Sequence, residues 1–119
     1  MVKAIAAISL IYDLSAGLTL LVFPQILPNW LGIPLPEPSI FLKLNGLFLI
    51  AVAAGYALPY REPERYRAYL WVFGVGLKSA GAAAFGIDGV SGGPAAMWLF
   101  AAGDAVMAAL SLIALRSAR

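Results

Sequence analysis

Four ionisable side chains interrupt the most apolar stretches of this 119-residue chain: Asp13, Lys43, Lys78 and Asp104. A charged group inside hydrocarbon costs roughly 3 kcal/mol on membrane-insertion scales, so such residues usually pair with one another or line a binding site or proton path. Two acids and two bases can form ion pairs, bind a polar headgroup or carbonyl, or move a proton. This set is the first candidate for a functional site.

The residue types that the chain lacks exclude much other chemistry. It contains no Cys and no His. It therefore has no thiolate nucleophile and no cysteine or imidazole ligand for zinc, copper, haem or an iron–sulfur cluster. It also has no phosphate-binding glycine motif and no Ser-His-Asp set. We expect no metal, no cofactor held by the chain alone and no intrinsic catalysis, although an Asp–Lys pair leaves a lipid-modifying enzyme open.

Composition places the chain in a membrane. It is 62% hydrophobic and 12% charged, whereas soluble domains contain about 25% charged residues. Four apolar segments, at residues 3–23, 39–60, 66–85 and 95–115, each approach the ~20 residues that cross a bilayer. All eight prolines lie outside these segments or at their ends. We predict an all-α fold, an antiparallel bundle of four transmembrane helices in a single domain, residues 1–119.

The positive charges predict the orientation of this bundle. Apart from Lys43 and Lys78 inside the spans, they lie at the N-terminus, in the middle loop and at the C-terminus, whereas the connections at 24–38 and 86–94 have none. This bias predicts cytoplasmic termini in a prokaryotic inner membrane. The chain lacks the basic, aromatic-interleaved patch of nucleic-acid-binding proteins, so the expected partner is the lipid bilayer. The charges concerned are Lys3, Arg61, Arg65, Arg67, Arg116 and Arg119.

Depth and helical spacing bring three of the four ionisable residues together. At ~1.5 Å per residue, Asp13, Lys78 and Asp104 lie at similar depth near the bilayer midplane. Lys43 lies nearer the outer surface, where its long stem allows the ammonium to reach the headgroups. Asn45 is on a different side of the same helix. Small residues share the faces of the three deep charges, which predicts that these faces point into the bundle: Ser9, Ala16, Gly17, Gly74, Gly81, Ala101, Ala108 and Ser111.

Two interpretations of this cluster stay open. In the structural one, Asp104 and Lys78 on sequential helices form an ion pair that fixes helix register. In the functional one, the cluster binds a polar headgroup, a quinone carbonyl or a proton. The neighbouring Tyr12 and Ser79 add hydrogen bonds only if the helices rotate them inward, and we expect them to be packing residues instead.

The first outer connection is apolar and rich in proline. Residues 24–38 are predicted to lie on the membrane surface, with a helical turn from Gln25 to Leu31. Trp30 then either anchors this segment at the interface or belongs to a lid over an outward-facing cavity.

A family resemblance rests on the layout of these residues. The pattern Asp13-Leu14-x-x-Gly17-x-x-Leu20-Leu21-x-x-Pro24, the Arg/Glu/Pro loop at 61–67, Lys78 in the third helix and Gly103-Asp104 in the fourth resemble the DoxX-like group of small bacterial membrane proteins. Members of that group are associated with membrane oxidoreductases, in one case as a subunit of a thiosulfate:quinone oxidoreductase. The resemblance implies an accessory subunit with a bound quinone or lipid, and it carries over no catalytic residue.

Two further comparisons compete with this one. The small multidrug resistance exporters are similar in length and helix number and place an acidic residue where Asp13 lies. Their near-unbiased charge differs from the one-sided charge here, and their tryptophan and glycine signatures are missing. A retinal Schiff base on Lys78 is the third possibility, but four helices are few to enclose retinal. We expect a homo-oligomer or a subunit of a membrane complex, with a proton-coupled transporter or a purely structural subunit as alternatives.

Overall fold

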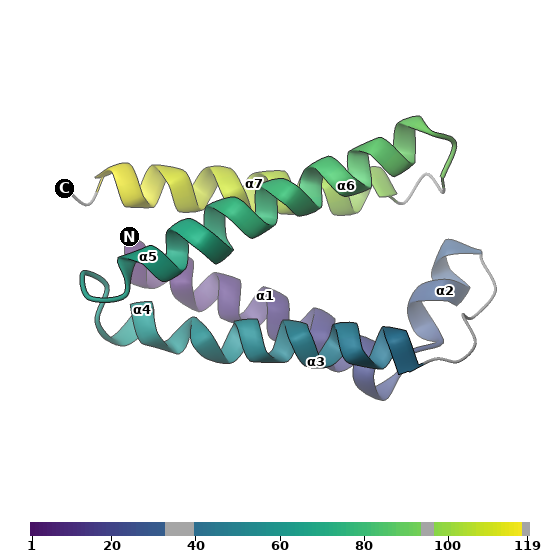
Figure 1. Ribbon diagram of the computed structural model, residues 1–119, viewed down its shortest axis with the longest axis horizontal. Helices are drawn as coiled ribbons and strands as arrows, with labels where there is room; N and C mark the ends of the chain where they lie inside the picture. Colours follow the sequence, from purple (N-terminus) through teal and green to yellow (C-terminus); the bar gives the residue numbers. More distant parts are fainter. Residues whose placement is uncertain (33–39, 94–96, 118–119) are drawn as a thin grey trace.

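The structure is a computed structural model that describes residues 1–32, 40–93 and 97–117, and every regular element in these ranges is helical (Figure 1). The predicted all-α class is thereby confirmed. The elements, in chain order, are α1 (Val2–Val22), α2 (Ile26–Leu31), α3 (Ile40–Gly55), α4 (Ala57–Arg61), α5 (Arg67–Tyr69), the π-helix η1 (Leu70–Leu77), α6 (Lys78–Val90) and α7 (Met97–Ser117).

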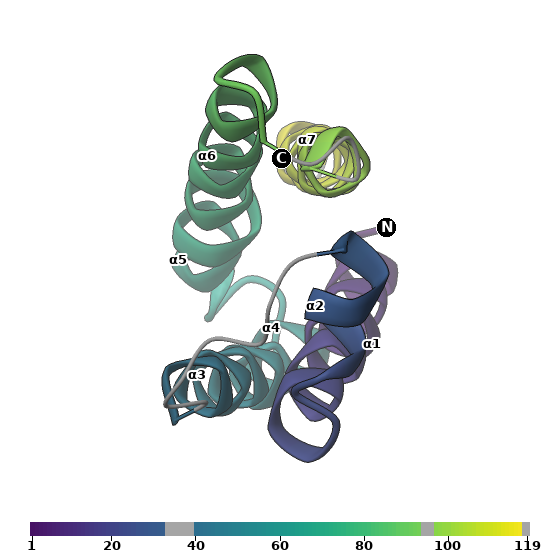
Figure 2. The ribbon, with the colours of Figure 1, turned by 90° about the vertical axis from the view of Figure 1, so that its right-hand side faces the viewer.

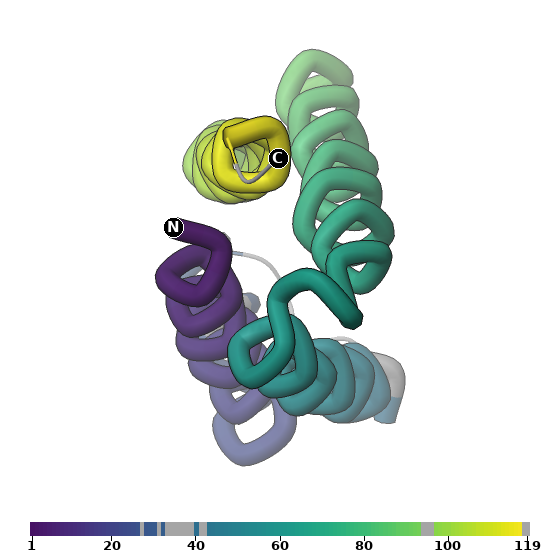
Figure 3. The backbone as a smooth tube through the Cα atoms, turned by 90° about the vertical axis from the view of Figure 1, so that its left-hand side faces the viewer, coloured from purple at the N-terminus to yellow at the C-terminus, as the bar shows by residue number. Residues whose placement is uncertain are grey.

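The helices form two antiparallel hairpins that lie against each other. In the first hairpin α1 packs along α3, and in the second α7 packs along the rod formed by α5, η1 and α6. The two views along the bundle show each hairpin as a separate pair, with α1 of the first beside α7 of the second (Figures 2 and 3). The molecule is 46 Å long, close to the ~40–45 Å of a whole bilayer.

Three helices are long and apolar enough to span a membrane: Val2–Val22, the rod Arg67–Val90 and Met97–Ser117. Large apolar side chains also cover the outside of the molecule. Together with the three helices, this large number of exposed apolar side chains points to a membrane protein. The exposed side chains include Ile8, Ile11, Leu18, Leu44, Leu47, Phe48, Val72, Leu99, Val106 and Ile113.

The second predicted segment, at residues 39–60, is not one continuous helix. Its first residue lies outside the described residues, and α3 ends at Gly55 before α4 begins at Ala57. Pro59 explains the break, because proline has no N–H to donate to the carbonyl of Gly55 and its ring crowds that carbonyl. At the break the Tyr56 N–H is shared between the carbonyl oxygens of Val52 and Ala53, at 3.3 and 3.1 Å.

The third predicted segment is longer than expected. Its helix continues to Val90, so the prediction that it ends at Phe85 and that a loop begins at residue 86 is wrong. The helix ends where Gly92 adopts a positive φ of 93° and the Gly93 N–H bonds to the carbonyl of Asp88 at 2.8 Å. Glycine adopts this left-handed conformation without steric penalty. Of the fourth predicted segment, 95–115, the described part begins at Met97 and stays helical to Ser117.

The two ends of the bundle differ. The N-terminus, the α4–α5 connection and the end of α7 lie together at what we call the terminal end, and α2 and the end of α6 lie at the opposite, or α2, end (Figure 1). The charged segments predicted to share one side are therefore at the same end. The main apolar cluster is also there, and it consists of Val2, Ile5, Ala6, Val52, Tyr56, Leu70, Ala114 and Leu115.

Candidate functional site

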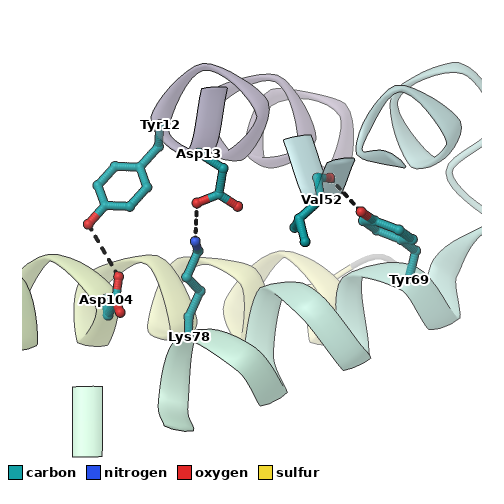
Figure 4. Close-up of polar contacts among 6 residues, drawn as sticks. All are labelled: Tyr12, Asp13, Val52, Tyr69, Lys78 and Asp104. Atoms are coloured by element: carbon teal, nitrogen blue, oxygen red, sulfur yellow. Dashed lines mark hydrogen bonds and ion pairs between the residues drawn. The ribbon is translucent and has the colours of Figure 1, made fainter. Parts of the chain in front are cut away.

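A buried ion pair joins the two hairpins. The Lys78 ammonium donates a hydrogen bond to Oδ1 of Asp13 (Figure 4). Asp13 is 0% exposed and Lys78 is 4% exposed. Asp13 comes from the middle of α1, whereas Lys78 is the first residue of α6. The pair therefore depends on the docking of one hairpin against the other.

The segment before Lys78 is held tightly against α7. The eight residues of η1 form a π-helix, a wide helical turn that occurs often at functional sites. Gly74 in η1 lets α7 approach, because a Cβ added there would lie 2.9 Å from the Ser111 hydroxyl oxygen. In α6, Gly81 faces the Asp104 carboxylate in the same way, and a Cβ there would overlap it. These contacts fix the position from which the Lys78 side chain extends toward α1.

A second polar contact between the hairpins lies beside the ion pair. The Tyr12 hydroxyl donates to Oδ1 of Asp104 at 3.2 Å (Figure 4). The Lys78 ammonium lies 5.0 Å from the centre of the Tyr12 ring, within the range of a cation–π interaction. Half-buried Asp104 is also within electrostatic range of Lys78. We call Tyr12, Asp13, Lys78 and Asp104 the polar layer.

The partners within this layer differ from those expected. The structural interpretation paired Lys78 with Asp104, but Lys78 bonds to Asp13. Asp104 contacts Gly81, almost one helical turn beyond Lys78, whereas the lysine stem crosses to α1. The view of Tyr12 as a packing residue is wrong, because its hydroxyl holds Asp104. The only sequence feature that pointed to a polar role for Tyr12 was its position next to Asp13.

Two other candidates lie outside the polar layer. Lys43 is half-buried near the start of α3, at the α2 end, and Asn45 is exposed. Neither side chain forms a hydrogen bond or ion pair with another described residue. The structure therefore does not bring them to the Asp13–Lys78 pair, and the interaction of Lys43 with headgroups stays a prediction. Ser79, next to Lys78, is exposed.

Trp30 forms an aromatic bridge between the hairpins at the α2 end. Its ring packs edge-on against Phe100 of α7, with 5.9 Å between ring centres. Phe100 in turn lies 5.4 Å from Phe85 of α6. Trp30 is still 59% exposed, which fits both roles considered for it, an anchor at the interface and part of a lid. The lid stays a prediction.

Tyr69 makes a further contact between the hairpins that the sequence did not indicate. Its hydroxyl donates to the carbonyl of Val52, close to the break between α3 and α4 (Figure 4). Gly55 provides the space, since a Cβ at that position would overlap the Tyr69 hydroxyl. The Tyr69 ring also packs edge-on against Tyr56 at 5.1 Å. A tyrosine near a helix end was interpreted only as an aromatic at the membrane interface.

The ion pair of the polar layer is closed off from the surface, since Asp13 is 0% exposed and Lys78 is 4% exposed. Two surface hollows, one at the terminal end near Lys3 and Arg67 and one between α6 and Trp98, are lined by other residues. A ligand therefore reaches Lys78 only if the side chains or hairpins around the pair move. Among the described residues no three acidic side chains converge to hold a metal ion. The layer is suited to binding an acceptor oxygen or a proton.

Comparison with protein-family models, curated proteins and solved structures found no match to this chain. The function must therefore be inferred from the polar layer and from the way the two hairpins meet.

Proposed function

We propose that this protein is an integral protein of a prokaryotic inner membrane and acts as a binding or accessory subunit, with the polar layer as its intramembrane site. The observation that carries the proposal is the Asp13–Lys78 pair, buried in an apolar bundle where the two hairpins meet. Ionisable residues at such depth are rare and typically belong to a binding site or an ion path.

A four-span topology is part of the proposal. The 16 residues of α3 extend about 24 Å at 1.5 Å per residue, which is shorter than ~30 Å of hydrocarbon. Tyr56 and the five residues of α4 bring this segment to about 33 Å, so we propose α3 and α4 together as the remaining span, interrupted at Tyr56. The positive charges at the terminal end favour a cytoplasmic location for that end.

Reporter fusions test this topology. A reporter fused after Arg119 or inserted between Glu62 and Arg65 should be cytoplasmic, and one inserted at Gly92 should be external. Equal populations of both orientations would contradict the charge argument and favour the exporter alternative.

The proposed ligand is a molecule that offers an acceptor oxygen at membrane depth. The Lys78 ammonium has three N–H donors, and Asp13 is its hydrogen-bond acceptor among the described residues. A quinone carbonyl or a lipid headgroup oxygen is a suitable further acceptor, and the DoxX-like resemblance implies the same two ligand classes. Such a ligand enters from the bilayer between the hairpins, so binding is coupled to their separation.

A charge-neutral double variant tests the site. Asp13→Asn/Lys78→Met removes both charges together and avoids an unpaired buried ion. The matched control is Glu62→Gln/Arg65→Met, which removes an acid–base pair of 3.7 Å that is exposed at the surface. Each protein is purified from membranes, and its bound lipids and quinones are measured by mass spectrometry.

We expect the control to retain the bound molecules of the wild type and the Asp13→Asn/Lys78→Met protein to lose them while it stays folded. If the folded double variant retains the same molecules in the same amounts, the pair is a structural device, as in the alternative role of a purely structural subunit.

A further inference from the structure

Three buried polar groups of the first hairpin have no protein partner on the side of the polar layer that faces the terminal end. They are Oδ2 of Asp13 and the hydroxyl groups of Ser9 and Tyr56, and none forms a hydrogen bond with a described residue. Ser9 is 1% exposed, and Asp13 and Tyr56 are 0% exposed. Buried polar side chains nearly always have a protein or water partner. Three such groups in one region therefore indicate a ligand.

The three groups come from one hairpin and face a common region. Ser9 precedes Asp13 by four residues and lies on the same face of α1. The Tyr56 hydroxyl, from the break between α3 and α4, lies close to Ser9 but outside direct hydrogen-bond geometry. Tyr56 is also within electrostatic range of Asp13. From the second hairpin, Tyr69 and Leu70 cover this region.

We propose that Ser9, Asp13 and Tyr56 form an internal water-binding site. The free carboxylate oxygen only accepts hydrogen bonds, whereas the two hydroxyl groups both donate and accept. Water satisfies such a mixed set, and an internal water typically makes two to four hydrogen bonds. The Tyr56 side chain also belongs to the apolar cluster of the terminal end.

The water site changes the role of the ion pair. With water bound to Oδ2, Asp13 has a hydrogen-bond partner other than Lys78. The carboxylate then stays solvated when the Lys78 ammonium turns to another acceptor. The water site does not depend on the proposed lipid or quinone ligand, because its three groups are unpartnered in the structure as it stands.

Radiolytic hydroxyl-radical footprinting of the full-length protein in detergent tests the site. Radicals formed from a bound water oxidise the side chain beside it, even when bulk solvent is excluded. Tyr56 should therefore be oxidised several-fold faster than Leu70 and Leu115, which are also 0% exposed in the same cluster. Each rate is divided by the rate for the same residue in the denatured protein, which corrects for intrinsic reactivity. Equal corrected rates for the three residues would overturn the proposal.

Two matched variants identify the ligands of the water. Ser9→Ala removes one of its three partners and should lower the oxidation rate of Tyr56 several-fold. Ser111→Ala removes another buried, unpartnered hydroxyl, which faces Gly74 within the second hairpin, and should leave that rate unchanged. An unchanged rate in Ser9→Ala, or an equal fall in both variants, would overturn the assignment. If Ser9→Ala does not fold, the comparison of Tyr56 with Leu70 and Leu115 in the wild type decides the question.

Discussion

The contacts within each hairpin differ in kind from the contacts between the hairpins. Inside the first hairpin, α1 and α3 cross with their backbones in contact: a Cβ added to Gly17 would lie 2.7 Å from the carbonyl oxygen of Gly46, and the reverse is also true. Inside the second, Gly74 and Gly81 admit side chains of α7. Close approach at small residues is the usual way in which membrane helices pack.

The contacts between the hairpins depend on polar and aromatic side chains instead. Lys78 bonds to Asp13, Tyr12 to Asp104 and Tyr69 to the carbonyl of Val52 (Figure 4). At the α2 end an aromatic contact joins the hairpins, and at the terminal end the apolar cluster does so.

This difference suggests separate roles for the two kinds of interface. Packing at glycine depends on shape and holds each hairpin as a unit. Hydrogen bonds and an ion pair have directions, so they favour one docking arrangement of the hairpins, and they can exchange partners with a ligand. A site that must open is better located between the hairpins than within one of them.

Removal of the Lys78 charge should have the largest effect. Lys78→Met leaves the Asp13 carboxylate buried beside no cation, and loss of one partner of a buried pair typically costs about 3–5 kcal/mol. Part of this loss is avoided if Asp13 takes up a proton. The free energy of unfolding is measured by SDS titration in mixed micelles. Addition of Asp13→Asn should recover most of the lost stability, and a double variant as unstable as Lys78→Met would contradict the buried-charge explanation.

A methyl group at the crossing of α1 and α3 should have the next largest effect. Gly46→Ala places its Cβ 2.7 Å from the Gly17 carbonyl oxygen and 2.9 Å from the Leu21 nitrogen. The backbones must separate, and we expect a loss of about 2 kcal/mol, within the usual range for overpacking. Gly86→Ala in α6 is the matched control, since its Cβ meets nothing within 4 Å. Equal unfolding free energies for the two variants would remove the packing role assigned to this crossing.

The sequence could predict the helices better than the hydrogen-bond partners of the polar side chains. Apolar runs and prolines indicated the helices, and small residues at helical offsets indicated that Asp13, Lys78 and Asp104 face inward. Pro59 also carried the signal for the break at Gly55, four residues earlier, but it was treated as a helix end. The extension of α6 to Val90 was missed because a loop was predicted to begin at residue 86. Residues 86–90 continue the helix, and the glycines at 92 and 93 end it.

The hydrogen-bond partner of each polar side chain depends on how its helix is rotated about its axis, which the spacing of residues in the sequence does not determine. A rotation of α1 by one residue, about 100°, would bring Tyr12 to the direction that Asp13 has in the structure. A lysine stem is long enough to reach either neighbouring helix, so sequential order favoured Asp104 while the hairpin geometry selected Asp13. Tyr69 was missed for a related reason, since its acceptor is a backbone carbonyl beside a helix break. Every residue has a backbone carbonyl, so the residue type does not show which carbonyl accepts a side-chain hydrogen bond.

The bond between Tyr12 and Asp104 should contribute less than the ion pair. Tyr12→Phe removes the hydroxyl that donates to Asp104 and keeps the ring below the Lys78 ammonium. We expect a loss of about 1.5 kcal/mol, as for a hydrogen bond to a charged group. A double-mutant cycle with Asp104→Asn should give a clear coupling energy, whereas Tyr12→Phe and Gly86→Ala should be additive. Additive effects of Tyr12→Phe and Asp104→Asn would indicate that the hydrogen bond does not stabilise hairpin docking.

The smallest effect is expected at Tyr69, where the docking contact is a single neutral hydrogen bond. Tyr69→Phe removes the donor to the Val52 carbonyl and keeps the aromatic contacts with Tyr56 and Phe73. A neutral hydrogen bond contributes about 1 kcal/mol, and we expect a loss of that size in the free energy of unfolding. Tyr66→Phe, three residues earlier, is the control and should leave stability unchanged, because its hydroxyl forms no hydrogen bond with a described residue. Since this contact lies between the hairpins, Tyr69→Phe should also speed hydrogen exchange at the ends of α3 and η1 while the α1–α3 crossing keeps its protection. Faster exchange at that crossing as well would mean that the two interfaces open together and that the hairpins are not separate units.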